Sequence, residues 1–181
     1  SEIEFAARYT EAKLIAITGS NGKTTTTLLT YHLLKEAGFK VGLAGNIGHS
    51  FAKQVLEQSF EWYVLEISSF QLDRCFDFSP DIAVLVNITP DHLDRYDYQF
   101  ENYIHSKFRI FQNAKAATQC ILWGDDEVIK QYKSLIPEKT QIQEIHFSPV
   151  KGSATITDDE IIFEKGRVQR ASAPIQGPHN A

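Results

Sequence analysis

One stretch decides the fold of this chain, and it reads Leu14-Ile15-Ala16-Ile17-Thr18-Gly19-Ser20-Asn21-Gly22-Lys23-Thr24-Thr25-Thr26-Thr27. A short apolar run with β-strand character comes first, and a helix follows. Between them, the glycines let backbone N–H groups turn towards a phosphate oxygen, and the helix N-terminus adds the positive end of its dipole. The order predicts a nucleotide phosphate-binding loop that contacts its ligand through residues 19–25.

Two side chains of this loop carry chemistry. Lys23 offers a mobile cation to the β- and γ-phosphates, and the Thr24 hydroxyl can bind Mg²⁺. The standard phosphate loop has a further glycine where Ile17 stands, so this is the shorter Gly-x-x-Gly-Lys-Thr form. The alternative is an ordinary strand-to-helix turn with a solvated lysine. The flanking strand and helix favour the phosphate loop, and the helix is supported by apolar residues at helical spacing and a stop signal, namely Leu28, Leu29, Tyr31, Leu33 and Gly38.

Composition limits the remaining possibilities. A chain of 181 residues suits one domain, and a formal charge of -5 gives no hint of a nucleic-acid surface. The sequence has no apolar run near the ~20 residues of a membrane helix and no signal-peptide pattern. Cys75 and Cys120 fit no metal-ligand spacing, so we expect reduced thiols in a cytoplasmic protein. The absence of methionine, and the stop directly after residues 177–180, lead us to expect a piece of a larger protein.

Strands and helices are expected to alternate along the chain, which predicts an α/β fold with a doubly wound, mostly parallel sheet. The run at 82–86 is apolar without alternation, which indicates a strand covered on both faces. Residues 153–170 are expected to add a small antiparallel β-hairpin appendage. The expected strands after the first are 40–43, 61–67, 81–88, 119–123 and 143–147, and the expected later helices are 49–58, 100–111 and 127–135.

In a doubly wound sheet, ligands bind beyond the carboxyl ends of the strands. Polar residues follow four of the expected strands, so they should meet at one edge and form a catalytic site. The strands deliver, in chain order, Lys23 and Thr24, then Asn46, then Glu66 with Ser68 and Ser69, and then Asn87, Asp91 and His92.

Glu66 and His92 each have two interpretations. Glu66 lies in an apolar strand, where a carboxylate is costly unless it is paired or bound to a metal such as Mg²⁺; the alternative is a strand-end glutamate exposed to water. A single histidine is usually structural or solvated, but the position of His92 at the expected site edge favours a function.

Lys107 is the most informative single residue. It lies within a helical stripe of apolar residues that comprises Phe100, Tyr103, Ile104, Phe108 and Phe111. Burial favours the neutral amine, which can react with CO₂ to give a carbamate, a carboxylate-like group able to bind a second Mg²⁺. The alternative is a lysine whose stem packs while its amine reaches water, and the pattern alone favours this alternative.

Together these motifs resemble the central ATP-binding domain of the Mur ligases, over nearly all of residues 1–181. The segment Ser68–Leu72 resembles the branch of the family that adds D-glutamate. The motifs that carry the resemblance are 19–26, 45–48, 65–72, 87–95 and Lys107.

The resemblance implies a ligase that uses ATP and two Mg²⁺ ions to join D-glutamate to UDP-N-acetylmuramoyl-L-alanine for peptidoglycan synthesis, through an acyl phosphate. It implies catalytic roles for Lys23, His92 and Lys107, with Lys23 on the phosphates. It also implies a first metal on Thr24 and Glu66, a second on His92 and carbamylated Lys107, substrate contacts from Asn46, Ser68 and Gln71, and an adenine contact from Asn180.

The family also has a uridine-binding domain before this domain and an amino-acid-binding domain after it. Neither is found in these 181 residues, so we expect the isolated chain to have little or no ligase activity. We also expect a monomer. Other hypotheses remain: a Mur-type ligase for another amino acid, a folylpolyglutamate synthase, a phosphate-loop kinase or switch, and a non-enzymatic nucleotide-binding module.

Overall fold

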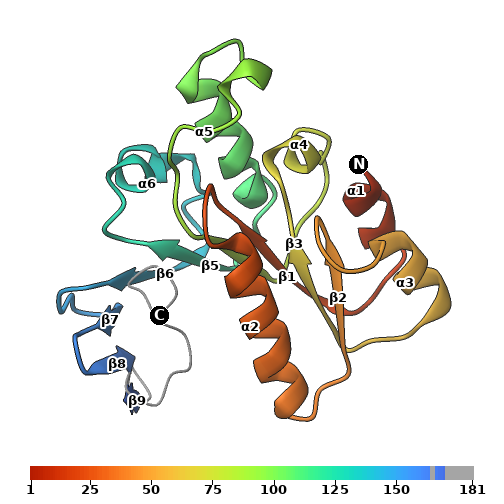
Figure 1. The fold of residues 1–181 in the computed structure, drawn as a ribbon, viewed down its shortest axis with the longest axis horizontal. Helices are drawn as coiled ribbons and strands as arrows, with labels where there is room; N and C mark the ends of the chain where they lie inside the picture. Colours follow the sequence, from red (N-terminus) through yellow and green to blue (C-terminus); the bar gives the residue numbers. More distant parts are fainter. Residues whose placement is uncertain (164–165, 170–181) are drawn as a thin grey trace.

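The computed structural model describes residues 1–163 and 166–169, and these form one nine-stranded sheet with helices around it (Figure 1). The strands are β1 Lys13–Thr18, β2 Val41–Gly45, β3 Trp62–Glu66, β4 Ile82–Leu85, β5 Gln119–Trp123, β6 Gln141–His146, β7 Ala154–Ile156, β8 Glu160–Phe163 and β9 Gly166–Gln169. The α-helices are α1 Glu2–Ala7, α2 Lys23–Glu36, α3 Phe51–Glu57, α4 Ser69–Leu72, α5 Phe100–Phe108 and α6 Glu127–Tyr132. Short 3₁₀ turns occupy Leu93–Arg95, Arg109–Phe111 and Lys133–Leu135.

The strand order places the first strand in the middle of the sheet. It runs β2-β3-β1-β4-β5-β6-β7-β8-β9, and β1 pairs in parallel with both β3 and β4. The chain therefore places β2 and β3 on one side of β1, and then crosses to place β4 and the later strands on the other side. This confirms the expected doubly wound α/β fold, whose ligands bind where the winding reverses, at the carboxyl end of β1.

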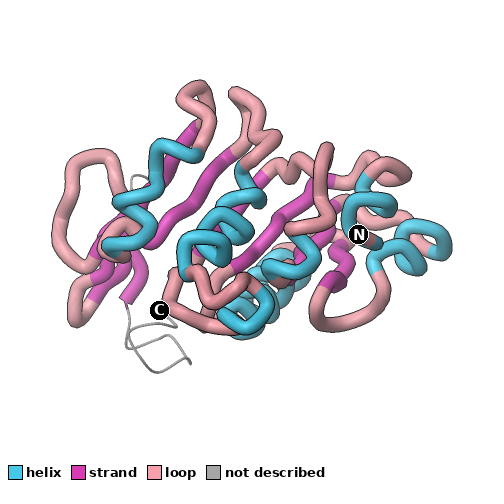
Figure 2. The backbone as a smooth tube through the Cα atoms, turned by 90° about the horizontal axis from the view of Figure 1, so that it is seen from above, coloured by secondary structure: helices cyan, strands magenta, loops and turns pink. Residues whose placement is uncertain are grey.

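The expected antiparallel hairpin is present in the described part of 153–170, because β8 pairs antiparallel with β7 and β9. The hairpin is joined to the main sheet. Strand β7 pairs in parallel with β6, with Ile145 opposite Ala154, so the hairpin continues the main sheet. Figures 1 and 2 show these strands at the end of the molecule opposite α1.

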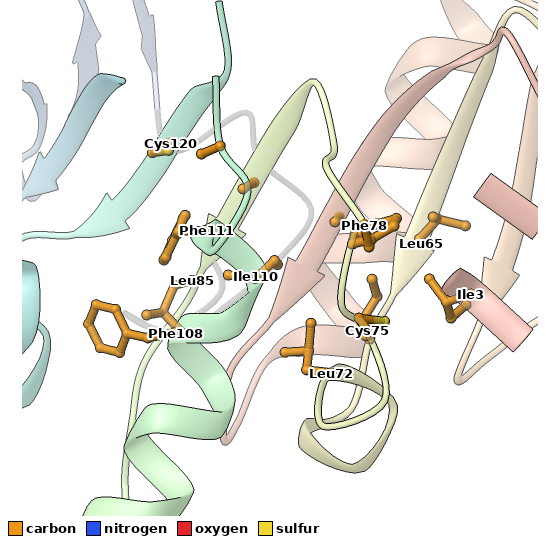
Figure 3. Packing of buried hydrophobic residues seen from close by; sticks show 14 of the residues in the cluster. Ile3, Leu65, Leu72, Cys75, Phe78, Leu85, Phe108, Ile110, Phe111 and Cys120 are labelled. Atoms are coloured by element: carbon orange, nitrogen blue, oxygen red, sulfur yellow. The ribbon is translucent and has the colours of Figure 1, made fainter. Parts of the chain in front are cut away.

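Two hydrophobic cores lie on opposite faces of the sheet. The larger core buries apolar residues of α1, α3, α4, α5 and α6 against the sheet, and Figure 3 shows Ile3, Leu72 and Phe108 within it. The smaller core packs Tyr31 and Leu34 of α2 onto the opposite face. No helix in the described ranges is long and apolar enough to cross a membrane.

The packing of α2 differs from its apolar pattern. Helix α2 forms as expected, but Leu28 and Leu33 are 45% and 59% exposed, because the helix packs through Thr27, Tyr31 and Leu34 instead. Strand β4 contributes to both cores, as expected for a strand covered on both faces: Ala83 and Leu85 are buried in the larger core, and Ile82 and Val84 are half-buried against the smaller one. Its half-buried side borders a groove of about 550 Å³ beside the phosphate loop, lined by Val84, Val86, Ile121, Trp123 and other residues.

One buried carboxylate fastens the N-terminal helix to the rest of the domain. Glu4 is 7% exposed and accepts hydrogen bonds from the backbone N–H groups of Phe76, Asp77 and Phe78 at 3.1, 3.1 and 2.9 Å. Burial alone would raise the pKa of Glu4, but the N–H group of Asp77, the Arg8 guanidinium and the other two N–H groups hold it below its ordinary value.

We expect Glu4→Gln to lower the free energy of unfolding by about 1–3 kcal/mol at pH 7, because an amide offers these N–H groups only one acceptor oxygen. The folded-state pKa is depressed, so the stabilisation is present above the ordinary pKa of 4.5 and is lost as the pH falls through the folded value. Urea denaturation at pH 7 and pH 3 measures both effects. Glu11→Gln, at an exposed position, is the control, and equal losses in the two variants would contradict the prediction.

Candidate active site

The phosphate loop is shaped by two glycines between β1 and α2. Gly22 takes a left-handed conformation, with φ of 78°, and caps the start of the helix. Gly19 lies against the end of β4, where a Cβ atom would come within 3.1 Å of the Val86 Cβ. Both positions therefore need glycine, and the loop leads directly into the free N–H groups of the first turn of α2, an anion-binding geometry.

The loop is held to the end of β4 by side chains. The Asn21 N–H donates to Asn87 Oδ1 at 2.9 Å, and the Asn87 side-chain amide Nδ2 donates to the Asn21 carbonyl at 3.0 Å. Ser20, which is 6% exposed, donates to the Thr89 carbonyl and accepts from the Thr89 N–H, each at 2.9 Å. The Ser20 side chain thus anchors the loop, which leaves its backbone for phosphate contact.

A group of polar side chains meets at the carboxyl ends of β1, β2 and β3. The Thr24 hydroxyl donates to Glu66 Oε2 at 2.7 Å, and the Asn46 amide donates to Glu66 Oε1 at 2.8 Å. Glu66 is only 1% exposed, so the alternative of a carboxylate in water is wrong. Lys23, the residue before Thr24, donates to the Ser20 carbonyl at 2.8 Å.

This group suits a hard cation bound next to a phosphate. No cluster of three or more His, Cys, Asp and Glu side chains that could hold a metal occurs in residues 1–163 and 166–169. A cation here would therefore take oxygen ligands from Thr24 and Glu66 and complete its shell with phosphate and water oxygens, as Mg²⁺ does at nucleotide sites.

Lys107 lies under the phosphate loop. Its side chain is among the largest that are fully buried, and its amine donates to the Gly19 carbonyl at 2.7 Å. Burial, and then the charge of Lys23, lower the pKa of Lys107 to about 7, against the opposing pull of Asp91, Glu66 and Asp73. The alternative in which the amine reaches water is therefore wrong, and a large share of this amine is neutral near pH 7.

His92 lies on the loop after β4, at the edge of the site. Its backbone is left-handed, with φ of 50°, and its ring packs against Phe70 with centroids 5.2 Å apart. Its Nε2 atom is 3.4 Å from Asp91 Oδ2. The imidazole is exposed, and no direct contact joins it to Lys107 within the described residues.

Ser68 and Gln71 are engaged with each other. The Gln71 N–H donates to Ser68 Oγ at 3.3 Å, and Gln71 Oε1 accepts from the Ser68 N–H at 3.0 Å, so the pair forms a capping box at the start of α4. Substrate contact by these residues stays a prediction. Thr25 is half-buried on the first turn of α2, and Asn180 lies outside the described residues.

Sequence reasoning missed the polar side chains that support the site from within the larger core. Tyr103 was expected only as a core aromatic, yet its hydroxyl lies 3.0 Å from Ser20 Oγ, and the Lys107 amine lies 5.1 Å from the centre of its ring. Tyr96 and Ser106 are buried too, with hydroxyls 3.1 Å apart. The available signal was the spacing of Tyr103 and Lys107, four residues apart on one helix.

Known proteins are similar to this chain in sequence. The family model for the Mur ligase middle domain matches residues 17–181. A UDP-N-acetylmuramoylalanine–D-glutamate ligase of Bacteroides fragilis is 50% identical over 99% of this chain and 41% of its own length. The same ligase of Bacteroides thetaiotaomicron is 62% identical over 72% of this chain and 30% of its own length. The chain therefore spans about two fifths of the length of the first of these relatives.

Solved structures show the same fold at low identity. A UDP-N-acetylmuramoyl-L-alanyl-D-glutamate–2,6-diaminopimelate ligase superposes with a TM-score of 0.77 at 21% identity, over 98% of this chain and 44% of its own. FolC of E. coli, solved with DHPP and ADP, gives 0.68 at 16% identity, over 99% of this chain and 54% of its own. The fold and the match of the family model to residues 17–181 together show that this chain belongs to the Mur ligase family, through its middle domain.

Proposed function

We propose that the full-length protein is an ATP-dependent ligase that joins D-glutamate to UDP-N-acetylmuramoyl-L-alanine in peptidoglycan precursor synthesis. The observation that carries the proposal is the 50% identity, over 99% of this chain, to a relative named for that reaction. The geometry supports it, because a phosphate loop, its lysine and a buried carboxylate meet at one edge of the sheet.

In this reaction, a carboxylate oxygen of the UDP-linked substrate attacks the γ-phosphorus of ATP. The bond to ADP breaks, and an acyl phosphate forms. The amine of D-glutamate then attacks the acyl carbon, an amine proton is lost, and phosphate leaves as the amide forms. Lys23 would hold and neutralise the β- and γ-phosphate oxygens, since phosphoryl transfer depends on positioning and charge stabilisation.

Two Mg²⁺ ions would supply charge neutralisation at the phosphates when bound. Thr24 and Glu66 would hold the first, and their oxygens already lie together at 2.7 Å. For the second, His92 would act together with a carbamate on Lys107. The carbamate forms when the neutral amine bonds to the carbon of CO₂ and releases a proton, and the lowered pKa of Lys107, about 7, favours that neutral amine.

The substrate side of the site would be formed by the carboxyl ends of β2 and β3. Asn46 donates to Glu66 and so lies beside the proposed metal. Ser68 and Gln71 follow β3 directly, and they would reach the UDP-linked substrate from the start of α4. Asn180 would contact adenine.

The test is amide formation by the full-length protein, with ATP, Mg²⁺ and UDP-N-acetylmuramoyl-L-alanine, and with D-glutamate, L-glutamate, L-lysine or diaminopimelate as the amine. We expect D-glutamate to be favoured at least ~10²-fold, with equal amounts of ADP, phosphate and amide. Lys23→Met should abolish ADP release, while Lys115→Met, at an exposed position, should not. Preference for another amine would reassign the substrate, folate extension by L-glutamate would point to a folylpolyglutamate synthase, and ATP binding without turnover would indicate a binding module.

A further inference from the structure

The loop that carries His92 has one buried residue. Of residues 89–99, all of which the structure describes, only Tyr96 is buried. Three non-glycine residues of this loop have left-handed backbones, namely His92, Asp97 and Tyr98 with φ of 50°, 54° and 56°. Such conformations persist only where surrounding contacts enforce them.

The Tyr96 hydroxyl makes those contacts with two other elements of the site. It donates to Asp73 Oδ2, at the end of α4, at 3.0 Å, and lies 3.1 Å from the Ser106 hydroxyl of α5. Ser106 in turn donates to the Ser69 carbonyl, at the start of α4, at 3.0 Å. One hydroxyl group thus joins the His92 loop to the helix that carries Gln71 and to the helix that carries Lys107.

The Tyr96 ring also lies in a series of contacts that runs from His92 to Lys107. The His92 ring packs on Phe70 at 5.2 Å between centroids, and Phe70 stacks on Tyr96 at 6.2 Å and 16°. Tyr96 meets Tyr103 edge-on at 5.4 Å, and the Lys107 amine lies 5.1 Å from the centre of the Tyr103 ring. His92 and Lys107 have no direct contact, and this series of rings connects them through the core, in addition to the bonds of Thr89 to Ser20 and of Lys107 to Gly19 in the phosphate loop.

We propose that Tyr96 is a positioning residue that sets the distance between His92 and Lys107, and so builds the second metal site. The proposal rests on the proposed function, because it assumes that His92 and Lys107 share a ligand. Tyr96 does not touch the reacting groups itself. Its hydroxyl holds the strained loop down, and its ring fixes the spacing to the side of α5 that carries Lys107.

The test is Tyr96→Phe in the full-length protein, with Tyr63→Phe as the matched control. Both remove one buried tyrosine hydroxyl, but that of Tyr63 has no hydrogen-bond partner among the described residues. Mn²⁺ is the probe, and its binding is followed by electron paramagnetic resonance with a non-hydrolysable ATP analogue. We expect Tyr96→Phe to weaken the second Mn²⁺ equivalent ~10-fold and to leave the first unchanged, and Tyr63→Phe to change neither.

Kinetics give a second measurement on the same variants. The Mg²⁺ concentration for half-maximal turnover should rise ~10-fold in Tyr96→Phe and stay constant in Tyr63→Phe, whereas a purely structural role would lower the melting temperature alone. Ser106→Ala should shift the Mg²⁺ requirement in the same direction, and the double variant should show less than the sum of the two effects, because both act through one network. The Ser106→Ala variant alone serves as the test if Tyr96→Phe does not fold.

An unchanged second Mn²⁺ affinity in both Tyr96→Phe and Ser106→Ala would overturn the proposal. This failure is distinct from failure of the proposed function. If the unaltered full-length protein forms no amide with any amino acid, the ligase assignment fails, and the Mn²⁺ measurement still decides whether Tyr96 shapes a metal site. If the unaltered protein binds only one Mn²⁺, the positioning role is overturned whatever the turnover.

Discussion

Replacing Lys107 by methionine in the full-length protein should lower amide formation by about 10²-fold or more and leave the affinity for ATP nearly unchanged. Methionine keeps an unbranched apolar stem but cannot form a carbamate, so the variant removes the proposed ligand and leaves the packing. The phosphate loop keeps its own anchors, because Ser20 and Asn21 are held by Thr89 and Asn87 rather than by Lys107.

The same substitution should make the protein more stable, because burial of this amine opposes folding. Its pKa falls from 10.5 in the unfolded chain to about 7 in the folded protein, so the unfolded chain binds more protons between these values, and stability rises with pH across that range. Methionine removes the cost, and the gain should be about 1–3 kcal/mol below pH 7 and should shrink towards pH 10. Urea denaturation at several pH values measures this gain.

Lys115→Met is the control for both measurements, because Lys115 is exposed on a turn after α5. It should change neither turnover nor the pH dependence of stability. Small carboxylates such as acetate or propionate, added to a Lys107→Ala variant, should restore part of the turnover by replacing the carbamate. Full activity in Lys107→Met would remove the second-metal hypothesis, and a loss of stability at every pH would show that the amine contributes more through its bond to Gly19 than burial costs.

The fold and the position of the site could be predicted because they depend on local patterns. Consecutive residues specify the order of strand, glycine-rich loop and helix. The carboxyl ends of parallel strands lie at one edge of the sheet, and this does not depend on the details of side-chain packing. The apolar helical stripe around Lys107 raised a buried amine as one of two interpretations, but the pattern alone favoured an amine in water, and only the structure shows that the amine is buried.

The partners of individual side chains could not be predicted, because they join residues far apart in the chain. The bond from Thr24 to Glu66 spans 42 positions; the resemblance placed both residues at one metal, but no residue near either of them predicts the hydrogen bond itself. Tyr96 lies in a polar loop between exposed neighbours, so its burial comes only from the way the loop folds onto α4 and α5. The exposure of Leu28 and Leu33 has the same origin, because the sheet decides which side of α2 is covered.

Glu66→Gln should reduce amide formation by about 10²–10³-fold through a weaker first metal site. Both carboxylate oxygens of Glu66 accept a hydrogen bond, one from Thr24 at 2.7 Å and one from Asn46 at 2.8 Å. An amide offers one acceptor oxygen and one donor, so it loses the negative charge and leaves one of these donors without its acceptor. The free energy of unfolding should therefore fall by about 1 kcal/mol as well.

The measurements separate charge from hydrogen bonding. Mn²⁺ binding with a non-hydrolysable ATP analogue should show a weakened first equivalent, the opposite of the pattern expected for Tyr96→Phe. Glu66→Asp keeps the charge and both oxygens on a shorter side chain, so it should retain more turnover than Glu66→Gln. Glu61→Gln is the matched control, because Glu61 precedes β3 at its other end, is exposed, and bonds only the Lys40 N–H among the described side-chain contacts.

Equal turnover in Glu66→Gln and Glu61→Gln would show that the buried carboxylate organises Thr24 and Asn46 without holding a cation. The first metal would then rest on Thr24 and the phosphates alone. Loss of turnover in Glu66→Gln with unchanged Mn²⁺ binding would instead assign Glu66 to the placement of Asn46 beside the substrate. Only a joint loss of first-site Mn²⁺ binding and of turnover fits the proposal that the Glu66 carboxylate is a ligand of the first metal ion.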